Sequence, residues 1–350
     1  MRQLYKFRNS DLDDFHGYIV FFFESIYFQS LTNYNDWNNY FIHSELKPFV
    51  KATRKLKPLL EKIHEEFLKV NQSEKKLVFD SARNSLDIQG ICHSEIPLAH
   101  KKDLSNDLGN AIHALFHYIY YQLPQTKIFT DKYGKLINHY EEIKRLNNDI
   151  KSCPFCGLHP IKPLESKTRQ TYDHYLPLSH YPFVGFNTQN LVPTCKPCNE
   201  DYKKDKEVLH SDTNRQNRRK LIFPYGNYAF SPKIKIDVLD YDPDTLKINR
   251  CLVNIGTEEN ICLDEMRTWC EIYEVDTRYR NIIVNDSDSW FDEFLEFHTQ
   301  QQIDQPILTK EDNFQTFMNS IKIQESTSNV ILKRPYFNSM STLTNAFSNN

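Results

Sequence analysis

The chain has 350 residues, of which 39% are apolar and 25% charged, so it can bury a core for one large domain or two average ones. It contains only 8 glycines and neither a GxGxxG nor a GxxxxGK[ST] string, which argues against a nucleotide-binding enzyme. The formal net charge of −3 is unevenly distributed. Residues 151–220 carry 12 basic and 7 acidic side chains, whereas residues 221–350 carry 11 basic and 20 acidic ones.

The sequence pattern of residues 1–150 predicts a helical region of unknown role. Apolar side chains recur at helical spacing through residues 46–67 and again through residues 103–123. The start of the chain is charged, and its longest apolar run, residues 18–23, is far too short to span a bilayer. We therefore expect a soluble cytoplasmic protein without a membrane segment.

The C-terminal part, residues 226–335, is expected to mix strands and helices. Residues 233–240 and 246–255 alternate between polar and apolar side chains around an Asp-Pro-Asp turn, which predicts a hairpin. Helical spacing returns over residues 261–282, 290–297 and 314–321, and the polar residues 336–350 are expected to form a disordered tail. Because this part is acidic, it is expected to contact protein rather than DNA.

Two Cys-x2-Cys pairs lie in the middle of the chain, at Cys153 and Cys156 and at Cys195 and Cys198. Disulfides are rare in the cytosol, and two such pairs are typical of a closed structural zinc site in which four thiolates surround Zn²⁺. The alternative is four unrelated buried thiols. The other cysteines, at positions 92, 251, 262 and 270, lack this spacing and are expected to be packing residues.

The segment between and after these pairs contains an Asp-His pair at Asp173 and His174, a proline three residues later, the string Asn190-Leu191-Val192, and Cys195-x2-Cys198-Asn199-x3-Lys203. This combination resembles the HNH endonuclease family, whose fold is the ββα-metal motif. The resemblance covers 50 to 70 residues around a zinc-stapled centre, for which we expect the bounds 151–225.

The resemblance implies a role for each matching residue. His174 would be the general base, Asp173 and Asn199 would bind a catalytic Mg²⁺ or Mn²⁺, and Asn190 would orient the histidine or support its loop. The chemistry of these side chains agrees, since an imidazole titrates near neutrality and Mg²⁺ prefers oxygen ligands. Adjacent residues of a strand point to opposite faces, so Asp173 and His174 can share one site only if the strand ends or bends there.

Several side chains admit two interpretations. The basic residues Lys203, Arg215, Arg218, Arg219 and Lys220 are candidates for phosphate contacts, or else a solvated helix and its exit. His180 either touches substrate or caps a loop. His113 and His117, four residues apart, either chelate a metal or belong to a packed helix face, and the apolar residues beside them favour packing.

The sequence therefore predicts an α+β protein that is mainly α. It has a helical N-terminal region, a zinc-stapled ββα-metal nuclease centre and an α+β C-terminal region. The predicted function is metal-dependent hydrolysis of DNA by a single-metal mechanism, with restriction or antiviral defence as the context. The alternatives are a zinc-stabilised nucleic-acid-binding module without catalysis and an RNA-cutting nuclease.

Overall fold

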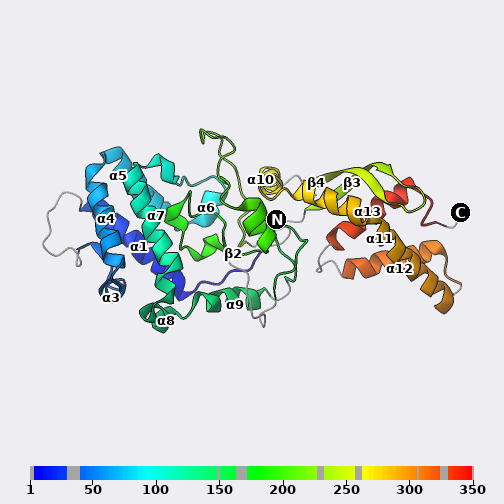
Figure 1. The fold of residues 1–350 in the computed structure, drawn as a ribbon, viewed down its shortest axis with the longest axis horizontal. Coiled ribbons are helices and arrows are strands. Elements are labelled where there is room, and N and C mark those ends of the chain that lie inside the picture. The colour runs from blue at the N-terminus through cyan, green and yellow to red at the C-terminus, as the bar shows by residue number, and fades with distance from the viewer. Residues whose placement is uncertain are drawn as a thin grey trace.

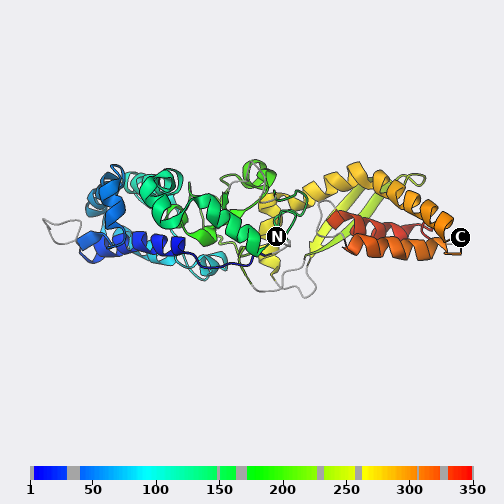
Figure 2. The ribbon, with the colours of Figure 1, turned by 90° about the horizontal axis from the view of Figure 1, so that it is seen from below.

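The computed structural model describes residues 4–29, 40–147, 150–162, 172–226, 232–256, 262–305, 307–323 and 330–348. These residues form an elongated molecule, with the N-terminal helices at one end and the C-terminal hairpin and helices at the other (Figures 1 and 2). Helices dominate, and the described strands form two separate two-stranded antiparallel sheets. The predicted class, α+β and mainly α, is confirmed.

The N-terminal helices are α1 (Asp11–Phe28), α3 (Lys47–Ala52), α4 (Leu56–Lys69), α5 (Gln72–Asn84), α6 (Ile88–Cys92), α7 (Asn106–Tyr121), α8 (Lys127–Tyr133) and α9 (Leu136–Leu146). Helix α4 buries Leu56, Leu60, Ile63 and Phe67, the one face that its spacing predicted. Asn71 is the N-cap of helix α5, and its side chain accepts a hydrogen bond from the amide of Glu74.

Helix α7 joins this helical region to the centre of the molecule. Its Phe116 lies parallel to Phe23 of α1 and at an angle to Phe183, which belongs to the segment after His174. Phe15 of α1 likewise meets Phe186 edge to face at 5.5 Å. The buried side chains of residues 1–150 and of the centre therefore form one continuous core, and the expected boundary near residue 150 is no break in packing.

The central part contains strands β1 (Tyr172–His174) and β2 (Leu191–Pro193) and the π-helix η5 (Pro197–Lys203). The two strands are antiparallel, with Asp173 opposite Val192 and His174 opposite Leu191. The N-terminal segment returns to this centre, where the Tyr5 hydroxyl donates to the carbonyl of Pro193. The order strand, strand, helix is the order that a ββα motif requires.

The C-terminal part contains β3 (Lys233–Tyr241), β4 (Ile248–Gly256), α10 (Leu263–Tyr273), α11 (Val275–Asp304), α12 (Lys310–Ile323) and α13 (Val330–Leu343). Strands β3 and β4 form the predicted antiparallel hairpin, and the Asp242 carboxylate accepts from two amides of its turn. The helical segment expected over residues 261–282 is divided, because Glu274 adopts a left-handed conformation between α10 and α11.

The expectation of a disordered tail over residues 336–350 requires correction for residues 336–348. Helix α13 continues to Leu343, and its Tyr336, Phe337 and Met340 are fully buried. Phe347 beyond it packs against Phe314 of α12 at 4.6 Å. The polar residues around 339–345 conceal this apolar face in the sequence, and the packing of α13 against β3, α11 and α12 explains its burial.

Among the helices that the structure describes, none has an apolar stretch long enough to cross a bilayer.

The first prediction concerns His16 in α1, which is buried. The Ser85 hydroxyl donates its proton to the Ala82 carbonyl, so it can only accept from His16, and Nε2 of His16 is the donor. Burial lowers the pKa of His16 to about 4 from its ordinary 6.5. The folded protein thus holds His16 neutral where an unfolded chain is protonated, so stability is complete above pH 6.5 and declines as the pH falls toward 4.

Replacing His16 with Gln should remove this part of the pH dependence, which amounts to at most about 3 kcal/mol of unfolding free energy over that range. Urea denaturation of both proteins between pH 7.5 and 5 measures it. Parallel pH dependences for wild type and His16→Gln would contradict the assignment of a neutral buried His16.

Candidate metal centre and ββα site

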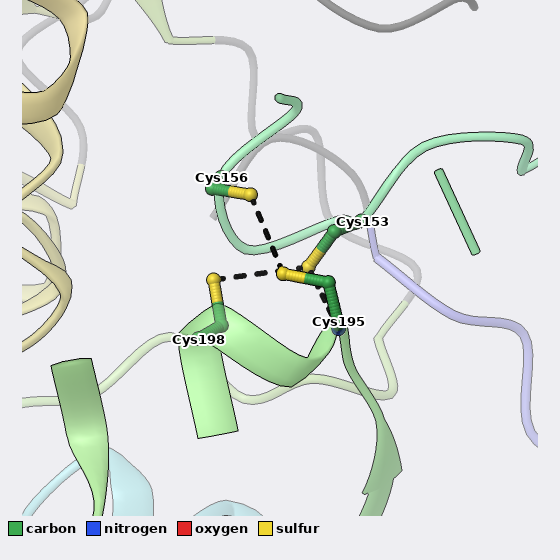
Figure 3. A group of neighbouring side chains, drawn as sticks. All are labelled: Cys153, Cys156, Cys195 and Cys198. Atoms are coloured by element: carbon green, nitrogen blue, oxygen red, sulfur yellow. Dashed lines mark hydrogen bonds between the residues drawn. The ribbon is translucent and has the colours of Figure 1, made fainter. Parts of the chain in front are cut away.

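Four buried cysteines converge in the centre of the molecule. The thiols of Cys153 and Cys198 lie 3.9 Å apart, those of Cys156 and Cys195 lie 3.8 Å apart, and all four sulfurs are within 4.8 Å of one another. In Figure 3 the four side chains point toward a common centre, with Cys153 and Cys156 on one loop, Cys195 just before η5 and Cys198 in its first turn. The sequence prediction that these four residues belong to one cluster is confirmed.

The spacing of the sulfurs fits one zinc ion. A tetrahedron of thiolates at ~2.3 Å from Zn²⁺ has sulfur–sulfur edges of about 3.8 Å, the separation of the two closest pairs. Burial raises the pKa values of Cys153 and Cys198 well above that of an ordinary thiol, so without an ion these two thiols hold their protons. Cysteines 153, 156, 195 and 198 would hold zinc with no coordination position left open, which makes the cluster a structural site.

Surrounding groups fix the orientation of the cysteines. The amide of Cys195 donates to the Cys153 sulfur and the amide of Leu158 to the Cys156 sulfur, each at 3.4 Å. The Arg278 guanidinium donates to the Cys198 sulfur at 3.4 Å and stacks on the Tyr202 ring. Cationic and amide donors of this kind offset the negative charge that four thiolates accumulate.

Helices α10 and α11 are anchored on the first cysteine loop. The Trp269 indole of α10 donates to the Phe155 carbonyl at 2.7 Å, and the Tyr279 hydroxyl of α11 donates to the Cys156 carbonyl at 2.8 Å. Gly157 closes this loop with a φ of +69°, a conformation that side chains with a Cβ rarely adopt. The cluster therefore joins the C-terminal helices to the ββα unit.

Strand β1 carries the Asp-His pair, and its two side chains have different neighbours. The Asp173 carboxylate is 2% exposed, and its Oδ1 accepts a 2.7 Å hydrogen bond from the Lys203 ammonium of η5. The same ammonium donates to the His174 carbonyl at 2.7 Å. Oδ2 of Asp173 is buried without a hydrogen-bond partner, and burial raises the pKa of this carboxyl group.

His174 lies against α7 and the loop before β2. Its Nε2 is 3.0 Å from the Gly185 carbonyl, and its ring meets Tyr120 of α7 at 4.3 Å. A carbonyl oxygen can only accept, so Nε2 carries the proton and Nδ1 is the basic nitrogen. Burial, assisted by the charge of Lys203, lowers the pKa of His174 to about 4. The imidazole is therefore neutral at pH 7.

Asn190 is completely buried and binds only the loop that follows β1. Its Oδ1 accepts from the Leu176 amide, while its Nδ2 donates to the carbonyls of Leu176 and Val184. Val184 immediately precedes Gly185, the acceptor for His174. Asn190 thus positions the histidine through the backbone, since its side-chain hydrogen bonds go to the backbone of Leu176 and Val184.

Asn199 is half-buried at the beginning of η5, directly after the zinc-cluster residue Cys198. Its Nδ2 is 3.5 Å from the Tyr172 carbonyl, so the amide lies beside β1. The structure consequently gathers Asp173, His174, Asn190 and Asn199 into one small unit.

Of the five predicted phosphate contacts, the one by Lys203 is wrong, and those by Arg215, Arg218, Arg219 and Lys220 stay predictions. Lys203 is only 1% exposed and neutralises Asp173, so it is an internal residue; the interleaved acids of residues 201–207 disguise this in the sequence. Arg215 pairs with Asp103, Arg219 pairs with Glu271, and Arg218 donates to the Ile91 carbonyl. Lys220 is exposed, and phosphate contact by Lys220 stays a prediction.

A second cluster, His100, His180 and Glu207, escaped sequence reasoning because its members come from three distant segments. It borders an open pocket of about 490 Å³. The nearest imidazole nitrogens lie 3.6 Å (His100 Nε2) and 3.5 Å (His180 Nδ1) from Oε2 of Glu207. Although burial acts in the opposite direction, the neighbouring His180 and a hydrogen bond from Tyr181 lower the pKa of Glu207 to about 2, so it is ionised.

Within this cluster, His100 is not oriented as a metal ligand. Nδ1 of His100 accepts from the Lys102 amide at 2.9 Å, so its proton is on Nε2, the nitrogen that faces Glu207. A metal-bound histidine instead donates from its second nitrogen. His180 Nδ1 lies 3.5 Å from Glu207 Oε2, and both atoms are buried without a hydrogen-bond partner.

Comparison with known proteins gives one short match. The chain is 33% identical over 69 residues to "Protein ea31" of Escherichia phage lambda, which is 20% of this chain and 20% of that protein. The chain thus spans about a fifth of the length of this relative. No protein-family model matches the chain, and no solved structure matches it.

The second prediction concerns the cysteine cluster. The purified chain should contain one zinc per molecule by elemental analysis, and Cys195→Ser should lose it. Structural zinc sites contribute on the order of 10 kcal/mol to folding, so this variant should be insoluble or unfolded in its central part. Cys270→Ser, at a half-buried thiol outside the cluster, is the matched control and should retain zinc. A freshly purified, unchelated protein free of zinc would refute the assignment.

Proposed function

We propose that the chain is a metal-dependent endonuclease that hydrolyses DNA with the HNH arrangement of residues. The observation that carries the proposal is the state of His174. It is a neutral imidazole with one nitrogen fixed to the Gly185 carbonyl and the other basic, on the first strand of a ββα unit. A side chain held in this way can take the proton from an attacking water.

The donor set beside it suits a hard cation. Asp173 offers a buried carboxylate oxygen without a partner, and Asn199 offers a neutral amide oxygen from the helix that faces β1. Oxygen ligands of this kind are what Mg²⁺ and Mn²⁺ prefer. Asp173 and Asn199 would hold the ion, which when bound would neutralise charge on the reacting phosphate.

The remaining residues of the site hold His174 and Asp173 in position. Asn190 fixes the loop that carries Gly185, and Gly185 fixes the tautomer of His174. Lys203 ties Asp173 and the carbonyl of His174 to η5, so the carboxylate and the backbone of the base move as one body with the zinc cluster. Removal of any of these hydrogen bonds would displace the base from its geometry.

A second candidate is a zinc-stabilised nucleic-acid-binding module without catalysis. The observation in its favour is that Asp173 is almost inaccessible and already paired with Lys203, so that an ion must compete with an ammonium for this carboxylate. Such a module would bind DNA but would leave a plasmid intact with any metal. We include restriction or antiviral defence in the proposal as its biological context.

The third prediction tests the base and the metal together. The wild-type chain should nick supercoiled plasmid with Mg²⁺ or Mn²⁺, and His174→Ala should lower the rate by about 10²-fold or more because proton transfer is removed. His43→Ala, in the N-terminal helical region, is the control and should cut normally. Brief EDTA treatment should stop cutting without unfolding the protein, and Mg²⁺ should restore it. Cutting by His174→Ala at the wild-type rate, or restoration by Zn²⁺ alone, would overturn the mechanism.

The fourth prediction uses the cover that Tyr120 gives to His174. Because the pKa of His174 is about 4, cleavage per bound substrate should be nearly equal at pH 5.5 and pH 8. Tyr120→Ala exposes the imidazole and should raise its pKa toward 6.5. The base is then increasingly protonated below pH 6.5, so kcat of this variant should fall selectively at pH 5.5. An unchanged ratio of kcat at the two pH values would show that His174 is not the titrating base.

A further inference from the structure

A continuous series of ring contacts runs from His174 to the surface along α7. Tyr120 meets His174 at 4.3 Å and Tyr121 at 4.8 Å, Tyr121 meets His117 at 4.6 Å, and His117 meets His113 at 6.0 Å. We call the four α7 residues of this series, His113, His117, Tyr120 and Tyr121, the α7 ring ladder. The hydrolysis proposed for His174 gives the outer rings of this ladder no role.

The ladder is accessible at its outer end. Tyr121 is 48% exposed and His117 is also exposed, whereas His113 and Tyr120 are half-buried. The packed helix face expected for His113 and His117 therefore holds in part for His113 and fails for His117. An exposed series of flat rings beside a catalytic candidate is a platform on which nucleobases can stack.

The charge around the ladder suits a polyanion. From Asn110 to Gln122 the helix contains no acidic residue. At its C-terminal end lies an open pocket of about 710 Å³, whose lining includes Tyr118, four exposed basic residues and one exposed acid: Arg54, Lys55, Lys127, Lys132 and Asp131. Lys55 donates to the Gln122 side chain, next to Tyr121, which places the pocket directly beside the ladder.

The opposite end of the ladder also has a basic neighbour. Besides burial, the charge of Lys101 lowers the pKa of His113, so this lysine lies close to the ring. Cations thus flank the rings on both sides, in the alternation of phosphate contacts and base stacking that single-strand binding proteins use. The bases of a duplex are already stacked on one another and cannot reach such a platform.

We propose that the α7 ring ladder and the basic pocket beside it form the docking surface for an unpaired DNA strand, which they lead to His174. The inference rests on the proposed function in one respect, namely that His174 is the end point of the path. The binding surface itself is defined by rings and cations that take no part in hydrolysis.

The fifth prediction measures binding in the full-length, zinc-loaded chain with His174→Ala as the non-cutting background. A fluorescein-labelled 15-nucleotide single strand of mixed sequence and the blunt duplex of the same sequence are the probes, and fluorescence anisotropy is the readout. Adding Tyr121→Ala should weaken binding of the single strand by about tenfold, the effect of removing the stacking of one base. Tyr121→Phe keeps the ring and should bind like the parent.

Two further variants separate stacking from charge. Tyr40→Ala removes an equally exposed tyrosine, 45% against 48%, outside the ladder and should change nothing. The double variant Arg54→Glu, Lys127→Glu should weaken binding. It should also reduce the slope of log K against log salt by about 1 to 2, because each phosphate that the protein no longer neutralises accounts for about 0.7 of that slope. The inference is overturned if Tyr121→Ala binds the single strand like the parent, or if the duplex binds as tightly as the single strand.

The outcome also distinguishes the two proposals. If the wild-type chain cuts no DNA but Tyr121→Ala abolishes single-strand binding, the ladder stands and the nuclease proposal fails. If the wild-type chain cuts and Tyr121→Ala binds and cuts with unchanged affinity and KM, the nuclease proposal stands and the ladder fails.

Discussion

Four buried sulfurs within 4.8 Å of one another are the constraint on which the centre of this molecule depends. Cys195 lies between strand β2 and helix η5 and Cys198 lies in the first turn of η5, so an ion held by both would fix the angle at which the helix meets the sheet. Cys153 and Cys156 bring a second loop to the same point, and the carbonyls of that loop receive Trp269 and Tyr279 from the C-terminal helices. An ion at this one site would tie the short strands, η5 and the first cysteine loop together, in addition to the apolar core that they share.

In the candidate site, Asp173 and His174 are held by different neighbours. On one side of β1, Lys203 holds Asp173 against η5 and leaves one carboxylate oxygen without a partner. Toward α7, Tyr120 and the Gly185 carbonyl hold His174 neutral and in one tautomer. Alternation along a strand places neighbouring side chains on opposite faces, and the structure shows how a strand that ends at His174 accommodates both residues in one unit. The ion pair with Lys203 is the feature that an incoming cation has to displace.

The sequence predicted the features that depend on local spacing. The faces of α4 and α7, the hairpin β3–β4 and the four cysteines follow from periodicity, turn residues and the Cys-x2-Cys pattern. Features set by distant contacts were not predictable in this way. Lys203 lies in a run of alternating charges that is typical of a solvated helix, and its burial follows from Asp173, thirty residues away. Helix α13 has the composition of a tail because its polar residues conceal the three side chains that α11 and α12 cover. The cluster of His100, His180 and Glu207 likewise forms only after folding.

The central claim is that one zinc ion, bound by four thiolates, organises the ββα unit and the helices around it. X-ray absorption at the zinc edge of the purified chain examines that coordination directly. The account predicts a first shell of four sulfur atoms at ~2.3 Å and no nitrogen or oxygen neighbour. A shell that contains imidazole nitrogen or carboxylate oxygen would place the zinc elsewhere and contradict the account.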